Sequence, residues 1–158
     1  MAASGLVYTV SVENATITNA AQDLWEFITA AGVSILIHSV RLTLVPTISS
    51  GVAQDLRMRL QMQQRTTTGS GGTAQTPRAL NRRNTVAAAT TCNSGVTTPG
   101  TAGNIWGADA VSIIVPYERI FTPDQRIPVS GGSRWNLTLL AGLGGSFACS
   151  SEVYFEEI

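Results

Sequence analysis

Apolar and polar residues alternate along several stretches of the chain, and the clearest alternation covers residues 56–63. Every second position there is apolar, namely Leu56, Met58, Leu60 and Met62. Arginine or glutamine fills each position in between. Successive side chains of an extended chain point to opposite sides, so this period of two predicts a β-strand with one buried face.

The same period predicts further strands. They cover residues 6–13, 33–45, 108–115 and 134–140, and a closing strand starts at residue 147. Residues 23–29 fit either a helix or a strand, and their aromatic and β-branched side chains favour a strand. Prolines interrupt the segment 117–129, which we therefore expect at a sheet edge or on the surface.

Residues 65–104 carry little apolar pattern. Long structureless loops are rare in a compact domain, so we predict a strand of small residues at 84–93. A Gly-rich loop at 69–72 and a turn at 97–103 would flank it. Residues 65–83 are rich in Gly, Thr and Arg, and we predict that they leave the sheet as a projecting arm or loop.

Together these segments predict an all-β fold. About eight antiparallel strands, separated by Gly, Pro and Asn signals, are typical of a β-sandwich or a jelly roll. A chain of 158 residues can bury one core, and we expect a single domain over residues 1–158.

Charge and composition exclude some classes of partner. Ten basic and ten acidic residues leave the chain neutral, so its overall charge does not attract nucleic acid or a membrane surface. Every basic residue is an arginine, which suits protein interfaces but also follows from a codon bias toward arginine. We expect no signal peptide and no transmembrane helix, because residues 1–6 lack a basic region and no apolar stretch is long enough.

The arginines are concentrated in and just before the predicted arm. Six of the ten lie between residues 57 and 83: Arg57, Arg59, Arg65, Arg78, Arg82 and Arg83. The Gly-rich part lacks the lysine and the following helix of a phosphate-binding loop, and no aromatic residues are interspersed for base stacking. We therefore predict a protein interface, with solvated loop charges as the alternative. The candidate interface residues are Arg65, Gly69, Gly71, Gly72, Arg78, Arg82 and Arg83.

The sequence shows no clear set of catalytic or metal-binding residues. His38 is the only histidine and lies in an apolar alternation, so we expect a core or interface residue rather than a metal ligand. Cys92 and Cys149 have no local pair spacing, and we expect free thiols in preference to a disulfide. We therefore predict that the protein is not an enzyme and has no cofactor. An enzyme on a β-sandwich would require His38.

Four segments allow a comparison with known families. They read TVSV at residues 9–12, TITNAAQDLWEF at 16–27, TTTGSGGTAQTPRAL at 66–80 and EVYFEEI at 152–158. They resemble a group of small virion structural proteins encoded by tailed bacteriophages. The wider class of similar size includes capsid decoration (cement) proteins with jelly-roll folds, which sit on the capsid lattice, often as trimers.

This resemblance implies a non-enzymatic capsid decoration protein that binds the shell and neighbouring copies through loops. The expected partners are the major capsid protein and further copies of the chain, with a trimer favoured and no direct contact with nucleic acid or membrane. The expected location is the virion, assembled in the host cytoplasm. The alternative is a tail or fibre component or a carbohydrate-binding β-module of a virion. Its candidate aromatic residues are Trp106, Tyr117 and Trp135, of which Trp135 is predicted to be buried.

Overall fold

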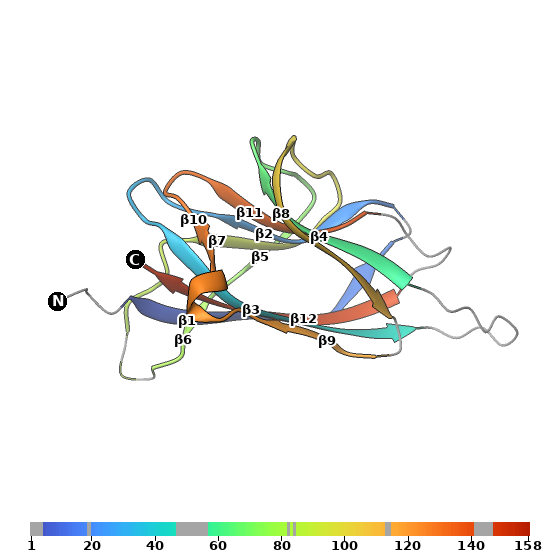
Figure 1. The fold of residues 1–158 in the computed structure, drawn as a ribbon, viewed down its shortest axis with the longest axis horizontal. Coiled ribbons are helices and arrows are strands. Elements are labelled where there is room, and N and C mark those ends of the chain that lie inside the picture. Colours follow the sequence, from blue (N-terminus) through green and yellow to red (C-terminus); the bar gives the residue numbers. More distant parts are fainter. Residues whose placement is uncertain are drawn as a thin grey trace, which may run out of the picture.

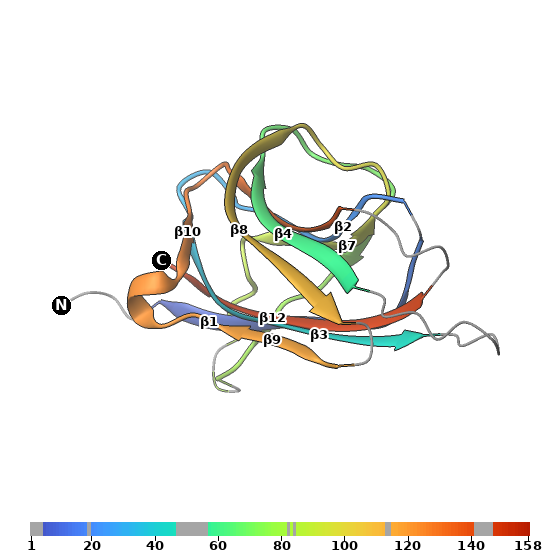
Figure 2. The same ribbon diagram turned by 45° about the vertical axis from the view of Figure 1, so that its right-hand side comes forward.

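The structure is a computed structural model that describes residues 5–18, 20–46, 57–81, 83, 85–112, 115–140 and 147–158. Two antiparallel sheets pack against each other as a β-sandwich (Figure 1). Figure 2 shows the two layers from a second direction, with the long strands of one sheet below and the more curved sheet above. The predicted all-β sandwich is confirmed, and the more specific jelly-roll topology stays a prediction.

Sheet A contains the first and the last strand of the chain side by side. Its order is β10-β3-β12-β1-β6, and β9 also pairs with β3. The bounds are β1 Leu6–Ile17, β3 Ile35–Pro46, β6 Arg78–Ala79, β9 Tyr117–Ile120, β10 Ile127–Val129 and β12 Phe147–Glu157. A short 3-10 helix, η1 (Pro123–Gln125), lies between β9 and β10. No helix in the described part of the chain is long and apolar enough to cross a membrane.

Sheet B has the order β5-β7-β2-β11-β4-β8. Its strands are β2 Gln22–Ile28, β4 Arg57–Arg65, β5 Thr73–Gln75, β7 Thr91–Val96, β8 Ala102–Ser112 and β11 Arg134–Leu139. Across both sheets, eight of the described strands have six residues or more, and β5, β6, β9 and β10 have two to four. The sequence pattern predicts about eight strands because these four are too short to show a period.

The core lies between the sheets and is rich in aromatic side chains. The Phe27 ring of sheet B lies 5.2 Å from the Phe155 ring of sheet A and 5.3 Å from the Trp135 ring, measured between centroids. Trp25 is also fully buried, and its indole N–H donates a hydrogen bond of 2.8 Å to the Ser151 hydroxyl in the other sheet. Burial of aromatic rings contributes about 25 cal/mol per Å² of apolar surface, so this cluster is a main source of stability. The predicted burial of Trp135 is confirmed.

Two strand boundaries differ from the sequence-based expectation. The predicted strand at 84–93 is wrong, because β7 begins at Thr91 and the described residues from 85 to 90 are not in a strand. β8 begins at Ala102 rather than at residue 108. The alanines and threonines before β7 have too little apolar surface to be drawn into the core, and most of them are exposed.

Candidate binding surfaces

The segment predicted to project from the sandwich, residues 65–83, returns to both sheets in its described part. Arg65 ends β4 and is only 7% exposed. β5 then pairs with β7 in sheet B, and β6 pairs with β1 in sheet A. The described part of the segment is therefore a crossover between the sheets and not a free arm. Arg82 lies outside the described residues.

A layer of buried polar side chains lies on the side of sheet B that faces away from sheet A. Asn136 and Thr138 belong to it, because they alternate along β11 with the core residues Trp135 and Leu137. Six residues, which we call the polar layer, are at most 7% exposed: Asp23, Glu26, Gln63, Arg65, Asn136 and Thr138. The sequence pattern does not mark these six residues as a group. The only signal was the pair of acidic residues within the apolar run of β2.

Asp23 is the centre of the polar layer and is fully buried. Its carboxylate accepts hydrogen bonds from Arg65 Nη2 at 2.8 Å and from Asn136 Nδ2 at 2.9 Å. The Thr138 hydroxyl donates a further, short hydrogen bond to it. A buried charge is tolerated when it is paired and hydrogen-bonded in this way.

The polar layer also holds two loops, residues 66–72 and 97–101. The Gly69 N–H donates to Glu26 Oε1 at 2.8 Å, and Arg65 Nη1 donates to the Gly100 carbonyl at 3.1 Å. In Figure 1 and Figure 2, the chain after β4 and before β8 rises on this outer side of sheet B. Arg65 and Gly69, two of the candidate interface residues, therefore donate hydrogen bonds to other residues of the same chain. Gly71 and Gly72 are exposed in the same loop.

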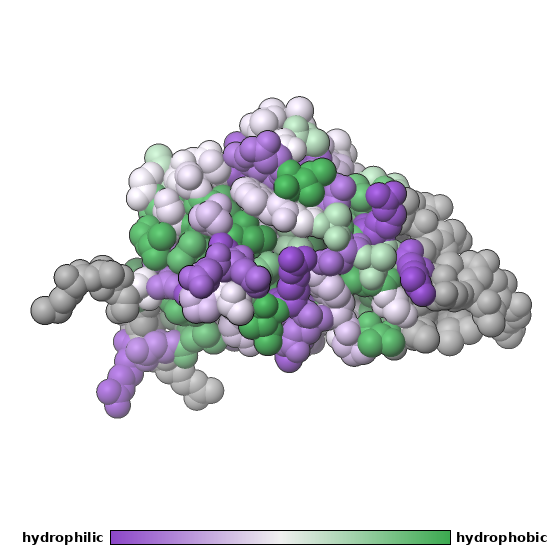
Figure 3. All heavy atoms as spheres, in the orientation of Figure 1, coloured by the Kyte–Doolittle hydropathy of each residue, from purple (hydrophilic) through white to green (hydrophobic). Residues whose placement is uncertain are grey.

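The remaining described candidates, Arg78 and Arg83, are exposed in and just after β6, the outer strand of sheet A. We call this region the β6 surface and define it by Arg78, Leu80, Arg83 and Val86. Leu80 and Val86 are 49% and 57% exposed, although both are apolar. The backbone here is tied to β1, because Leu80 N–H donates to the Val7 carbonyl at 3.0 Å. Hydrophilic side chains project at the lower left of Figure 3, where Figure 1 places β6.

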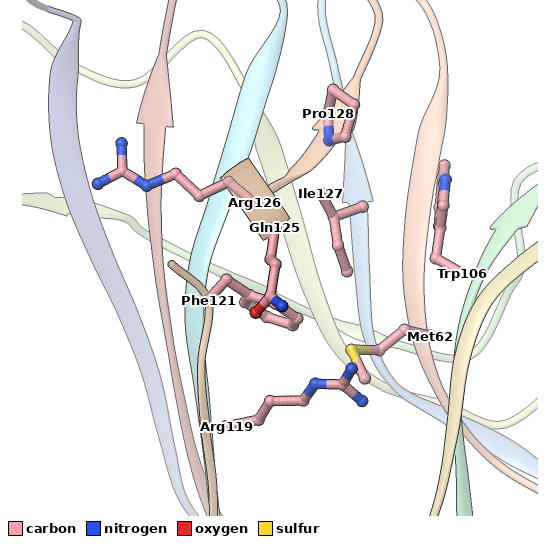
Figure 4. A pocket seen from close by; sticks show the side chains of 8 residues that line it. All are labelled: Met62, Trp106, Arg119, Phe121, Gln125, Arg126, Ile127 and Pro128. Atoms are coloured by element: carbon pink, nitrogen blue, oxygen red, sulfur yellow. The ribbon is translucent and has the colours of Figure 1, made fainter. Parts of the chain in front are cut away.

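A hollow of about 310 Å³ opens between β8 of sheet B and the β9–η1–β10 segment of sheet A (Figure 4). Trp106 lines it and is 38% exposed. Arg119 lines it too, and its Nη1 donates to Asp109 Oδ2 at 2.7 Å, which ties β9 to β8. The Tyr117 hydroxyl donates to the same oxygen at 2.6 Å. Burial, followed by the hydrogen bond to Asp109, raises the pKa of Tyr117, so the phenol keeps its proton.

His38, Cys92 and Cys149 lie on three different strands of the described structure, β3, β7 and β12. His38 is partly exposed on β3, and its Nε2 lies 3.0 Å from a Glu156 carboxylate oxygen. Burial and the charge of Arg126 lower the pKa of His38 and outweigh the opposing effect of Glu156. Cys92 and Cys149 are buried free thiols, as predicted, and burial raises the pKa of Cys149 to about 12. No group of three metal-binding side chains occurs among the described residues.

Comparisons of the chain with protein-family models, with curated proteins and with solved structures found no match. The resemblance of its four segments to tailed-phage proteins therefore stays a prediction. In the described part of the chain, the β6 surface and the hollow beside Trp106 are two surfaces that a partner or a ligand can reach.

Proposed function

We propose that the protein is a non-enzymatic structural component of a tailed-phage virion, a capsid decoration protein that binds the shell and neighbouring copies. The β6 surface supports this proposal. It combines two exposed arginines with two exposed apolar side chains, which is the composition of a protein interface. Its proposed partners are the major capsid protein and further copies of the chain, with a trimer as the expected oligomer.

The position of the β6 surface favours a protein partner. β6 is only two residues long and forms the outer edge of sheet A, so a partner strand or loop can approach the sheet there. The contacts of Leu80 and Tyr8 hold this backbone against β1, since the Tyr8 hydroxyl donates to the Val86 carbonyl at 3.2 Å. A backbone held by such contacts loses less conformational entropy when it binds a partner.

The pairing of the buried and partly buried polar groups also suits a structural role. The buried carboxylate of Asp23 is bound to Arg65, and the His38 ring is hydrogen-bonded to Glu156. Burial raises the pKa of both thiols, which keeps them as unreactive thiols near neutral pH. Such internal pairing leaves these groups engaged within the sandwich, as expected of a protein whose role is structural.

The test is co-sedimentation of the purified protein with capsid shells that were assembled without it. We expect the wild-type protein to sediment with the shells. The double variant Arg78→Glu/Arg83→Glu reverses both charges of the β6 surface and should weaken binding by about tenfold or more, equivalent to ~1.4 kcal/mol.

Arg59→Glu is the matched control, because Arg59 is also an exposed strand arginine but lies on β4 of sheet B. It should bind shells like the wild-type protein. Absence of wild-type binding would reject the decoration function. Equal binding by the double variant and the control would reject the β6 surface as the contact.

A further inference from the structure

The hollow beside Trp106 is separate from the β6 surface. It lies where β8 and the β9–η1–β10 segment meet, whereas β6 forms the opposite edge of sheet A. Its floor is apolar and contains Met62, Phe121 and Ile127. Its volume of about 310 Å³ falls within the ~300–1,000 Å³ of small-molecule sites. Because the hollow and the β6 surface lie at opposite edges of sheet A, a ligand in the hollow leaves the β6 surface accessible.

Trp106 differs from the other two tryptophans in its exposure. Trp25 and Trp135 are 0% exposed in the core, whereas Trp106 is 38% exposed and stands at one side of the hollow (Figure 4). A large aromatic side chain that faces solvent beside a concave site offers a flat apolar surface to a ligand ring.

The planar side chains of Arg119 and Gln125 lie near Trp106 in the hollow (Figure 4). Contacts with Asp109 and with Phe121 fix the position of Arg119. The Arg119 guanidinium is bound to Asp109 at 2.7 Å and lies over the Phe121 ring, with 5.2 Å between its Cζ atom and the ring centroid. The Gln125 side chain reaches into the hollow from η1 in Figure 4. A fixed guanidinium and a nearby amide can donate and accept hydrogen bonds with little loss of entropy on binding.

Each arginine that lines the hollow is paired with a carboxylate of the protein. Asp109 neutralises Arg119 at close range. The Arg126 guanidinium points away from the hollow in Figure 4 and forms an ion pair with Glu156 at 3.5 Å. A site whose arginines are both paired with carboxylates of the protein fits a neutral ligand with hydroxyl groups better than an anion.

We propose that this hollow binds a neutral saccharide, with one sugar ring stacked on Trp106 and its hydroxyl groups bonded to Arg119 and Gln125, which both line it. A pyranose has an apolar C–H face and a polar rim, so it matches an indole surface beside planar polar groups. This activity goes beyond shell binding and uses the edge of sheet A opposite to β6.

The test uses quenching of tryptophan fluorescence by acrylamide, which reaches Trp106 but not the two buried indoles. The neutral probes are glucose, galactose, mannose, N-acetylglucosamine, maltohexaose and cellohexaose. Glucuronic acid, N-acetylneuraminic acid and a proline-rich decapeptide are the comparison ligands. We expect at least one neutral saccharide to reduce quenching at millimolar concentration and to bind more tightly than every comparison ligand.

Calorimetric titration with the best neutral probe then tests the residues. Trp106→Ala should weaken binding by about tenfold or more, and Trp106→Phe should retain part of the affinity. Gln125→Ala should weaken binding severalfold without touching the contact between Arg119 and Asp109. Arg59→Glu serves as the control with unchanged affinity, and unaltered urea midpoints show that each variant is folded.

The proposal is overturned if no neutral probe binds, if an acidic sugar or the peptide binds most tightly, or if Trp106→Ala binds like the wild-type protein. Shell binding separates this site from the β6 surface. Trp106→Ala should co-sediment with shells normally, and Arg78→Glu/Arg83→Glu should retain saccharide binding.

Discussion

Asp23 is a charged side chain in β2, whose other residues are apolar or aromatic except Gln22 and Glu26. It is fully buried, yet it lies outside the hydrophobic core cluster. Its negative charge is compensated by Arg65, and two further donors complete its hydrogen bonds. Removal of one partner from such a group leaves the other charge buried without compensation, which costs more than the loss of the contact itself.

We therefore predict that Asp23→Ala lowers the free energy of unfolding by about 3–5 kcal/mol. Urea denaturation followed by tryptophan fluorescence measures this change. The double variant Asp23→Leu/Arg65→Met should cost less than the sum of its single variants, because it removes both charges together.

The exposed pair Arg41–Glu118 provides the control for this prediction. Its side chains are 56% and 46% exposed, so Arg41→Ala should cost no more than about 1 kcal/mol. An equal loss of stability in Arg41→Ala and Asp23→Ala would show that the polar layer does not stabilise the fold as proposed.

At the level of elements, the two loops 66–72 and 97–101 support each other above the polar layer. Thr66 N–H donates to the Thr101 carbonyl at 2.9 Å, and Ser70 and Thr98 form a β-bridge. Gly100 lies so close to the other loop that a Cβ atom there would overlap the carbonyl oxygen of Thr67. The glycine at this position is required by the close approach of the two backbones.

We predict that Gly100→Ala separates the loops and destabilises the protein by about 1–3 kcal/mol. The Gly69 amide should then exchange its hydrogen faster, since its bond to Glu26 depends on the loop position. Hydrogen exchange measured by NMR detects both effects. Ser70→Ala, an exposed change in the same loop, should alter stability by less than about 0.5 kcal/mol, and equal exchange rates in the two variants would contradict the prediction.

The strands were predictable where one face is apolar and the other polar. β11 and β12 follow the expected alternation, because their inward side chains, such as Trp135 and Phe155, enter the core. β7 was misplaced, because its sequence of Thr, Cys, Asn, Ser, Gly and Val carries only weak apolar contrast. Its position is decided by pairing with β2, which no local pattern reveals.

At the level of the whole molecule, the two sheets share one aromatic core, and each sheet carries one buried thiol. Cys92 lies in β7 of sheet B, and Cys149 lies in β12 of sheet A. They are 1% and 2% exposed. Reagents for thiols can therefore reach either one only when its sheet opens.

We predict that both cysteines become reactive together, at the same urea concentration, because one core holds both sheets in a single cooperative unit. Labelling with a disulfide reagent, followed by mass spectrometry of Cys92 and Cys149 peptides, measures each site. The variants Cys92→Ala and Cys149→Ala show whether loss of one thiol shifts the midpoint of the other. Clearly different midpoints would mean that the two sheets unfold as separate domains.

The sequence by itself determined the class of fold. Period-two alternation specifies strands with one buried face, and enough such strands can only bury their apolar faces by packing sheets together. It also indicated free thiols and a buried Trp135, both of which the structure confirms. These features depend on local pattern and on composition, which a sequence contains directly.

Only the tertiary structure determines which arginines form ion pairs inside the chain and which stay exposed. Arg65 has the same local setting as an exposed loop arginine, but the pairing of β2, β11 and β4 brings it to Asp23 and buries it. Contacts between Asp23 and Arg65, or between Asp109 and Arg119, depend on strand order and register, which sequence spacing does not encode. For the same reason the hollow beside Trp106 was not foreseen, since its two sides come from different sheets.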